Sequence, residues 1–421
     1  MPTKKGGSFF RAKDTTPSSV FIAARDCSPR TLPPRERERS MGAEGEMPWP
    51  LLRKKDGQSP PPHSPPPPPP PPPPAILGLQ PSALVDHVAR VDWALLDGIP
   101  GDRGGSQQVN IEDLNHILSQ VNTHILSFLN DLSPMRTIAG GSVANTIRGL
   151  TAGFGVPSGI IGAFGDDEQG RMFIHNMSFS GVDVSRLRMK KGPTGQCACL
   201  VDAHGNRTMR PCLSNAVKLQ ANELTREDFR GSKWLVLRYA HFNLEIINTA
   251  IKLAKQEGVS VSMDLASFEM VRDSRTHLIS LLETGNIDLC FANEDEAREL
   301  TRGEPKADQE AALSFLAKHC KWAVVTLASK GCIAKHGKEV VRVPAIGEAH
   351  AIDATGAGDL FASGFLYGLV KGLPLEDCCK MGSCSGGSVI RSLGGEVRPE
   401  NWQWMYKQMQ AKGLLLPDLK N

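Results

Sequence analysis

Short apolar segments rich in β-branched residues alternate along most of the chain with segments whose apolar residues recur every three or four positions. The short segments predict buried strands at residues 75–79, 159–164, 234–237, 259–263, 287–291 and 323–326. The periodic segments predict amphipathic helices over residues 110–130, 244–257 and 309–319. Strands that alternate with helices indicate a parallel sheet covered on both faces, so the expected fold class is α/β.

Three further features accompany this alternation. Residues 197–201 and 207–209 flank a turn and predict a hairpin, which we place in a separate small sheet. Asp86 follows the first predicted strand, and the carboxyl ends of strands are where open α/β sheets bind ligands. Gly140 and Gly141 open a further predicted helix that continues through Leu150.

The first 74 residues differ from the rest in composition. They hold 20 of the 31 prolines and carry a net charge of +5, whereas the remainder carries −2. They lack periodic apolar patterning, so residues 1–74 are expected to be a disordered basic tail before one globular domain at residues 75–421. The run Pro65 to Pro74 predicts a polyproline II spacer, which is either a plain linker or a ligand for a polyproline-binding partner.

The tail also bears on localisation. Residues 9–25 are mildly amphipathic with few acids and are compatible with part of a transit peptide for a plastid or mitochondrion. Met41 is the alternative start of a cytosolic form. Ten cysteines are too sparse for a disulfide scaffold and do not form paired C-x-x-C zinc sites, which favours a reduced compartment. The cytoplasm is therefore the expected location, with an organelle as the alternative.

Composition excludes several classes of function. No stretch of 18 or more apolar residues occurs, so no membrane association is expected. The globular part has no basic excess, so no nucleic-acid binding is expected. The phosphate-binding loop G-x-x-x-x-G-K-[ST] and the dinucleotide-binding G-x-G-x-x-G are both absent.

The segment 353–365 carries the clearest chemistry. Gly356, Ala357 and Gly358 open a helix whose free N–H groups favour an anion, and their small side chains let a phosphate approach the backbone. Asp359 lies in the first turn, where a carboxylate can accept the proton of an attacking hydroxyl. From physics alone, a plain glycine-rich turn with Asp359 as a helix-dipole partner remains equally open.

Residues 353–359 resemble the D-T-x-G-A-G-D signature of the PfkB, or ribokinase-like, kinases. Further segments resemble the other motifs of this family in the family's order, across residues 76–404. They are G-G-x-x-x-N at 140–145, G-x-D-x-x-G at 165–170, N-x-x-E at 293–296 and T-x-G-x-x-G at 326–331. Ala354 stands where the family often has Thr, and Ala328 replaces the glycine of the last motif.

The resemblance implies a ribokinase-like three-layer α/β/α fold with a mostly parallel central sheet and a small β lid, formed around residues 79–90 and 194–212. It implies that Asp359 is the general base and that the N–H groups of Gly356, Ala357 and Gly358 form an anion hole. The other implied site residues fall into four groups. They are Asp86, Gly140, Gly141 and Asn145 for the substrate; Thr326, Ser329 and Gly331 for ATP; Asn293 and Glu296 for Mg²⁺, largely through water; and Asp353 and Thr355 for K⁺.

Two features favour a nucleoside as substrate. Ser142 follows the glycine pair, and a full helix separates Asp86 from Gly140, as in adenosine kinase-like members of the family. The expected activity is ATP- and Mg²⁺-dependent phosphorylation of a ribosyl 5′-hydroxyl by a monomer or homodimer. The alternatives are a kinase for ribose, fructose or a related polyol, an inactive kinase-like subunit, and a docking protein organised by the tail.

Overall fold

The computed structural model describes residues 73–127, 135–305, 307–347 and 351–418. The chain divides into two units, Met1–Pro68 and Pro69–Asn421, and every described residue belongs to the second. Apart from Pro73 and Pro74, the predicted tail, with its polyproline run, its transit segment and Met41, lies outside the described residues. In the described part, no helix is long and apolar enough to cross a membrane.

The main sheet of the described unit has nine strands in the order β13-β12-β11-β10-β9-β8-β1-β4-β5. Their bounds are β1 Ile76–Ser82, β4 Ser158–Gly165, β5 Leu187–Lys190, β8 Trp234–Arg238, β9 Ser260–Asp264, β10 Leu289–Asn293, β11 Trp322–Thr326, β12 Cys332–His336 and β13 Glu339–Val343. All neighbours from β5 to β11 are parallel, as predicted, while β12 and β13 form an antiparallel edge that the sequence did not predict.

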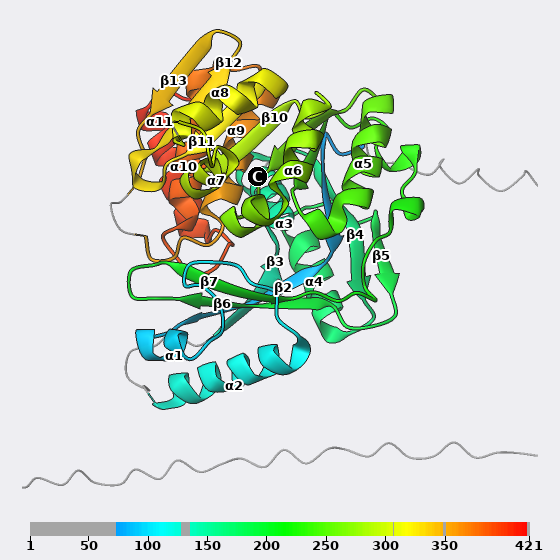
Figure 1. Cartoon of the computed structure of the whole chain (residues 1–421), viewed down its shortest axis with the longest axis vertical. Helices are drawn as coiled ribbons and strands as arrows, with labels where there is room; N and C mark the ends of the chain where they lie inside the picture. Colours follow the sequence, from blue (N-terminus) through cyan, green and yellow to red (C-terminus); the bar gives the residue numbers. More distant parts are fainter. Residues whose placement is uncertain (1–72, 128–134, 306, 348–350, 419–421) are drawn as a thin grey trace, which may run out of the picture. The chain divides into compact units, whose positions relative to one another are not determined.

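Helices cover both faces of the main sheet (Figure 1). One face carries α5 Leu244–Gln256, α6 Phe268–Glu283, α7 Glu294–Leu300 and α8 Gln309–His319. The opposite face carries α3 Ser142–Phe154, α4 Glu168–Phe179, α9 Ala357–Val370, α10 Leu375–Val389 and α11 Pro399–Ala411. Alternate strand residues such as Ile76 and Leu77 enter the two opposite cores, which is the period of a strand buried on both sides. The predicted three-layer α/β/α architecture is confirmed.

A second sheet has four strands in the order β3-β2-β6-β7. The bounds of these strands are β2 Leu84–Arg90, β3 Arg136–Gly140, β6 Gly195–Val201 and β7 Arg207–Cys212. The predicted hairpin is the antiparallel pair β6–β7, and it lies in this separate sheet as expected. Two helices, α1 Trp93–Asp97 and α2 Ile111–Ser127, pack on one face of the small sheet (Figure 1).

Asp86 lies beyond the first strand, as expected, but the predicted end of that strand at residue 79 was too early. Strand β1 continues through Pro81 to Ser82, with a shift of register between Gln80 and Ser82, and β2 begins two residues later. Asp86 is therefore inside β2 of the small sheet. Proline lacks the N–H that a regular ladder of hydrogen bonds requires, so Pro81 is typical of an irregular position in a strand. In the sequence, such a proline indicates a turn, which is why the predicted strand ended before it.

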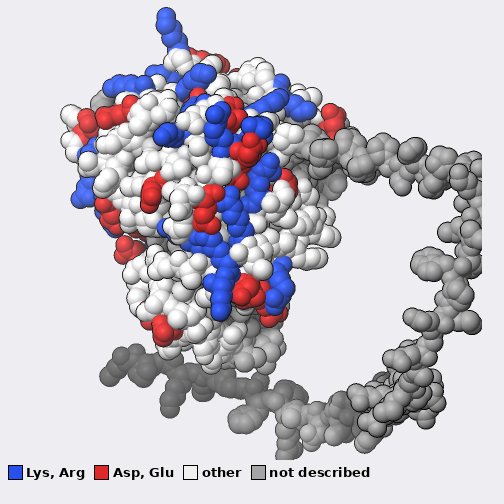
Figure 2. All heavy atoms as spheres, turned by 90° about the vertical axis from the view of Figure 1, so that its right-hand side faces the viewer, with Lys and Arg blue, Asp and Glu red and all other residues white. Residues whose placement is uncertain are grey.

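Charged side chains of both signs lie together on the face shown in Figure 2. In the described residues, ion pairs connect β5 and the segments around it to their neighbours: Arg186–Asp183, Arg188–Asp228, Lys190–Glu223 and Arg226–Glu257. Half-exposed pairs of this kind each contribute only about 0–1 kcal/mol to stability. Because each basic side chain in these pairs lies beside an acidic one, this face of the molecule carries mixed charge and is not a basic surface.

Candidate active site

Helix α9 begins at a left-handed glycine. Gly356 is its N-cap, with φ +79°, and a Cβ there would approach the Cα of Gly395 at 3.0 Å. Two residues further on, a Cβ at Gly358 would meet no other described atom within 4 Å. The first turn of α9 is therefore open on the side of Gly358, so its N–H groups can receive an anion there.

Asp359 lies in the same turn, and its carboxylate is held by side chains from another helix. The Ser142 hydroxyl donates to Oδ1, and Asn145 Nδ2 donates to Oδ2 at 2.9 Å. The Asp359 carbonyl accepts hydrogen bonds from Ser363 Oγ at 2.9 Å and from Thr146 Oγ1 at 3.2 Å. The start of α3 thus fixes the orientation of the carboxylate beside the open turn of α9.

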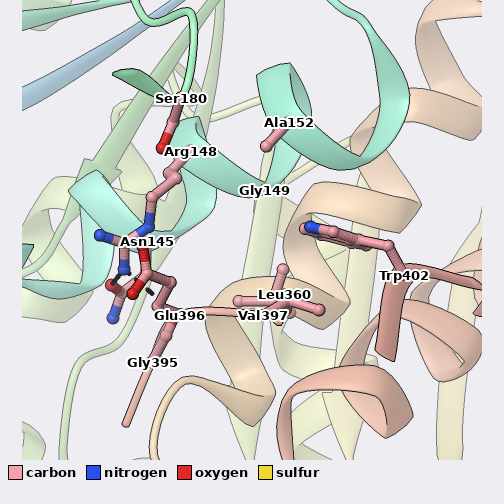
Figure 3. Close-up of a pocket in the computed structure, with 10 residues that line it drawn as sticks. All are labelled: Asn145, Arg148, Gly149, Ala152, Ser180, Leu360, Gly395, Glu396, Val397 and Trp402. Carbon is pink, nitrogen blue, oxygen red and sulfur yellow. Dashed lines mark hydrogen bonds between the residues drawn. The ribbon is translucent and has the colours of Figure 1, made fainter. Parts of the chain in front are cut away.

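Arg148 extends this network into the protein interior (Figure 3). Arg148 is 4% exposed, and its guanidinium donates to Asn145 Oδ1 at 2.8 Å, to the Ala139 carbonyl at 3.0 Å and to Asn176 Oδ1 at 2.6 Å. Burial lowers the pKa of Arg148, and neighbouring carboxylates oppose that shift. Arg148 therefore orients Asn145, which in turn donates to Asp359. The sequence signal that could have identified it is an arginine on the otherwise apolar face of α3.

Asp86 lies against the start of α3. A Cβ at Gly140 would collide with its carboxyl group, which explains the requirement for glycine at that position. Asp86 is 1% exposed, and its Oδ1 has no hydrogen-bond partner among the described residues. Burial raises the pKa of Asp86 to about 7, with Arg148 opposing the shift and Asp359 adding to it. A buried carboxylate with a free oxygen is suited to accept hydroxyl groups of a ligand.

Gly141 is the N-cap of α3, with φ +95°. A Cβ there would collide with the side chain of Gln80. Gln80 Nε2 donates to the Gly140 carbonyl at 3.2 Å, and its Oε1 accepts from the Ala144 N–H at 3.0 Å. Gln80 therefore occupies the N-terminus of α3, and sequence reasoning did not identify it.

A cavity of about 360 Å³ lies between the small sheet and the edge of the main sheet. Its wall includes residues from both sheets and from the connections: Gln80, Leu84, Gln108, Gly141, Ser142, Leu213, Lys218, Arg238, Phe242, Asn243 and Met270. Ser142 and Val143 also line a smaller neighbouring void that reaches Asp359 and Asp264. Of the predicted substrate residues, Gly141 lines the large cavity, whereas Asp86, Gly140 and Asn145 are not part of its wall.

The predicted nucleotide residues meet at the carboxyl end of β11. Thr326 ends that strand and pairs in register with Asn293 at the end of β10. Ser329 is exposed in the turn that follows, and Gly331 has φ +97° with no room for a Cβ beside Val343. Ala328 has φ +48°, a left-handed conformation that favours glycine. The substitution noted in the sequence therefore falls where glycine would fit the backbone.

Asn293 and Glu296 hold each other as a capping box at the start of α7. The Asn293 N–H donates to one Glu296 carboxylate oxygen at 2.8 Å, and Asn293 Nδ2 donates to the other at 2.7 Å. Burial, followed by the charge of Asp264, raises the pKa of Glu296 to about 8. Because both carboxylate oxygens are already engaged, the pair fits a role toward Mg²⁺ through water better than direct ligation.

Asp264, at the end of β9, is a further acid that sequence reasoning missed. Its Oδ1 accepts from the Ala266 N–H at 2.8 Å. Burial raises the pKa of Asp264 to about 6, with Arg238 opposing the shift and Asp359 adding to it. Arg238 ends the neighbouring strand and donates to the Ala266 carbonyl at 2.7 Å. These residues place one arginine among several carboxylates at the carboxyl edge of the sheet.

The predicted K⁺ residues form a separate buried group. Asp353 is 0% exposed and accepts from the Thr355 N–H at 2.8 Å and from the Gly394 N–H at 2.7 Å. Thr355 Oγ1 is buried and has no partner among the described residues. An orphaned hydroxyl oxygen next to a buried carboxylate fits the oxygen ligands that a hard monovalent cation requires.

Comparison with known proteins agrees with this geometry. A model of the pfkB family carbohydrate kinases matches residues 128–401. The 5-dehydro-2-deoxygluconokinase of Geobacillus thermodenitrificans is 26% identical over 265 residues, which cover 60% of this chain and 78% of that protein.

Two solved structures are similar over nearly their whole length. A probable sugar kinase from Rhizobium etli has a TM-score of 0.71 and 28% identity, covering 81% of this chain and 99% of its own. Adenosine kinase from Sinorhizobium meliloti has a TM-score of 0.71 and 29% identity, covering 80% of this chain and 99% of its own. The ribokinase-like form of the three-layer fold is thereby confirmed. The chain belongs to the pfkB family of carbohydrate kinases and is a phosphotransferase that acts on a hydroxyl group of a sugar or nucleoside.

Proposed function

We propose that the enzyme transfers the γ-phosphoryl group of ATP to the 5′-hydroxyl of a nucleoside, with Asp359 as general base. One observation carries this proposal. The Asp359 carboxylate is held by Ser142 and Asn145 in the first turn of a helix that is open at Gly358. A base and an anion-binding turn thus lie side by side, as transfer of a phosphoryl group to an alcohol requires.

Different residues of the chain would have different roles in the transfer. Asp359 accepts the proton of the attacking hydroxyl, and the N–H groups of Gly356, Ala357 and Gly358 stabilise the charge on the transferring group. Asp86 accepts hydrogen bonds from neighbouring hydroxyls and so positions the acceptor. Mg²⁺, when bound with ATP, neutralises phosphate charge, and the Asn293–Glu296 pair would orient its water ligands.

The wall of the large cavity favours a nucleoside. A cavity of about 360 Å³ exceeds the needs of one sugar ring, and Phe242, Met270 and Leu213 supply apolar surface for a base. The resemblance of Ser142 and of the helix before Gly140 to adenosine kinase-like proteins supports the same choice. The small sheet, which is predicted to act as a lid, would close over this cavity and exclude water.

A specific observation supports a second candidate, a kinase for an acidic sugar. Lys218 and Arg238 both line the cavity, and cations there would bind a carboxylate. Burial lowers the pKa of Lys218, and a bound carboxylate would offset that cost. The relatives that are 5-dehydro-2-deoxygluconokinases are compatible with this choice.

A coupled ADP-release assay tests both candidates with one panel of nucleosides, neutral sugars and sugar acids. Turnover of a nucleoside that survives Lys218→Gln supports the first, and turnover of a sugar acid that Lys218→Gln reduces at least tenfold supports the second. Arg230→Gln removes a cation from an exposed surface pair and is the matched control. No turnover with any acceptor would contradict the proposed activity.

The cation site at Asp353 and Thr355 extends the proposal to K⁺ activation. Rates in K⁺ should exceed rates in Na⁺ at equal ionic strength, and Thr355→Val should remove the difference by deleting the orphaned oxygen. Equal rates in both salts would contradict it. Cytoplasmic location, a monomer or homodimer, and a partner for the polyproline run stay predictions from the sequence.

A further inference from the structure

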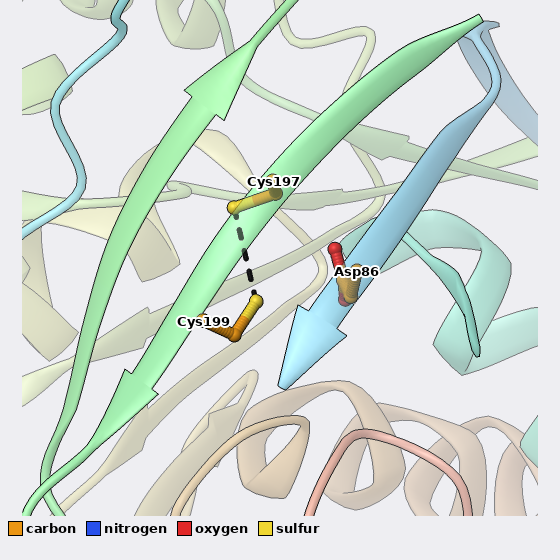
Figure 4. Close-up of side chains that lie close together, drawn as sticks. All are labelled: Asp86, Cys197 and Cys199. Carbon is orange, nitrogen blue, oxygen red and sulfur yellow. Dashed lines mark hydrogen bonds between the residues drawn. The ribbon is translucent and has the colours of Figure 1, made fainter. Parts of the chain in front are cut away.

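Strands β2 and β6 place three metal-ligating side chains on one face of the small sheet. Asp86 of β2 pairs in register with Cys197 of β6. Cys197 and Cys199 are two positions apart on the same strand, so both point to the same face. Figure 4 shows the two thiols beside the carboxyl group of Asp86. We propose that these three residues form a site for a thiophilic divalent cation such as Zn²⁺.

The spacing of the donor atoms fits a tetrahedral ion. The two Sγ atoms are 3.8 Å apart. Two Zn–S bonds of about 2.3 Å at the tetrahedral angle separate their sulfur atoms by about 3.8 Å, so the thiols already lie one tetrahedral edge apart. A carboxylate oxygen of Asp86 lies within 4.8 Å of both sulfur atoms.

The burial of the donors supports the same conclusion. Asp86 is 1% exposed, and both thiols are 0% exposed. Asp86 Oδ1 has no hydrogen-bond partner among the described residues, although a buried polar atom without a partner costs about 1–3 kcal/mol. A cation bound to the carboxylate would offset this cost, and a water or ligand would complete the fourth position.

A disulfide between the same two cysteines is a poorer fit. Residues two apart on an extended strand have Cα atoms about 6.6 Å apart. That separation lies at the upper end of what a disulfide spans, and the two Cβ atoms point the same way instead of toward each other. The geometry favours a metal that binds both sulfur atoms over a bond between them.

Charge also balances around the proposed site. When Zn²⁺ binds, the two thiols release their protons to solvent, and two thiolates with one carboxylate leave a net charge of −1. The buried guanidinium of Arg148 already acts on the Asp86 carboxylate and supplies the compensating positive charge.

The site has a functional consequence that rests on the proposed function of Asp86. A cation that binds the Asp86 carboxylate takes the oxygen that would accept the hydroxyls of the acceptor substrate. Zn²⁺ should therefore inhibit the enzyme in competition with the acceptor and not in competition with ATP.

Cobalt binding to the full-length chain tests the site without any activity assay. The protein is reduced with a phosphine, freed of metal and titrated with Co²⁺, which shows thiolate charge-transfer and tetrahedral d–d absorption. We expect one equivalent to bind, to be displaced by Zn²⁺, and to show two sulfur neighbours by X-ray absorption. Absence of these bands in the wild-type protein would overturn the proposal. A protein mass that stays two hydrogens low after phosphine treatment, with the loss mapped to a Cys197–Cys199 disulfide, would overturn it as well.

Variants assign the bands to the three residues. C197S/C199S should abolish Co²⁺ binding, and Asp86→Asn should weaken it at least tenfold. The pair Cys290 and Cys320 also brings two buried thiols together, but no carboxylate completes a three-ligand group there among the described residues. C290S/C320S is therefore the matched control and should bind Co²⁺ like the wild type. Unchanged bands in C197S/C199S would overturn the site, and circular dichroism checks that each variant is folded.

Kinetics then separate the site from the proposed function. We expect Zn²⁺ to raise the apparent KM for the acceptor at least tenfold, and C197S/C199S to remove that effect. Co²⁺ binding without inhibition would support the site and contradict the role of Asp86 as substrate anchor. If no acceptor is turned over, the proposed function fails while the spectroscopic result still decides the site.

Discussion

Helices α3 and α9 begin in the same way and differ in what occupies their first turn. Each has a left-handed glycine as N-cap, Gly141 with φ +95° and Gly356 with φ +79°. At α3 the side chain of Gln80 fills the turn and accepts from the Ala144 N–H. At α9, a Cβ at Gly358 would meet no described atom within 4 Å beyond its chain neighbours and the nearby backbone of its own helix.

The difference shows that glycines at a helix start can have two separate uses. At α3 the glycines let Gln80 and Asp86 pack closely, which fixes the helix that carries Ser142 and Asn145. At α9 they leave the N–H groups free for a ligand. One helix start orients the Asp359 carboxylate, and the other carries Asp359 in its first turn, beside the proposed anion site.

The largest effect should come from Asp359→Asn. The amide keeps the shape of the side chain but cannot accept the proton, so kcat should fall by about 10²–10⁴-fold with little change in stability. Asp377→Asn changes an acid in the first turn of α10 and is the matched control, expected to leave kcat unaltered. An ADP-release assay measures both. Full activity of Asp359→Asn would show that α9 presents only a structural turn.

The second prediction compares the two helix starts directly. Gly141→Ala forces a side chain into left-handed backbone and against Gln80, so it should lower the free energy of unfolding by about 2–4 kcal/mol. Gly358→Ala has room and helical backbone, so stability should change by less than about 1 kcal/mol. Its methyl group would instead hold the phosphate away from the N–H groups and lower kcat by about 10–100-fold.

Urea unfolding and steady-state kinetics on both glycine variants check the comparison. A stable Gly358→Ala with lowered kcat, beside an unstable Gly141→Ala, would support the view that only one start is open to a ligand. Equal losses of stability in the two variants would contradict the view that the start of α3 is filled and the start of α9 is open.

The third prediction concerns Arg148, the positioning residue behind α3. Lysine keeps the charge but lacks the planar guanidinium whose two terminal nitrogens donate separately to the Ala139 carbonyl and to Asn145, so Asn145 should orient Asp359 less well. We expect Arg148→Lys to lower kcat about tenfold while KM for ATP stays constant. Arg188→Lys breaks a two-point contact with Asp228 away from the site and is the control. A fall in stability with no change in kcat would assign Arg148 a structural role alone.

The sequence predicted the layers of the fold because each buried strand is a short apolar run with a helix beside it. It also predicted that a helix begins at the small residues before Asp359, since these residues are adjacent in the chain, whereas their catalytic roles stay predictions. It ended the first strand too early and missed β2, because Pro81 interrupts the pattern while β1 continues past it. Strand β3 could not be predicted, because its five residues show no clear alternation of apolar and polar positions.

The contacts that build the site could not be predicted from local patterns. Gln80 lies 64 residues before the N–H that it accepts from, and Arg148 donates to the Gly395 carbonyl 247 residues away. Such pairings follow from the packing of α3 against β1 and the C-terminal segment, not from spacing. A buried arginine or glutamine on an apolar face indicates only that a partner must exist.

The smallest effect should come from Ala328, where a third turn begins with left-handed backbone but without glycine. Its side chain is exposed, so Ala328→Gly removes backbone strain without losing packing and should raise the free energy of unfolding by about 0.5–1 kcal/mol. Ala317→Gly, inside α8, should change stability by about the same amount in the opposite direction. Urea unfolding measures both variants, and KM for ATP should stay constant in Ala328→Gly because the turn keeps its shape. A loss of stability in Ala328→Gly would show that the nucleotide turn, unlike the starts of α3 and α9, gains nothing from glycine.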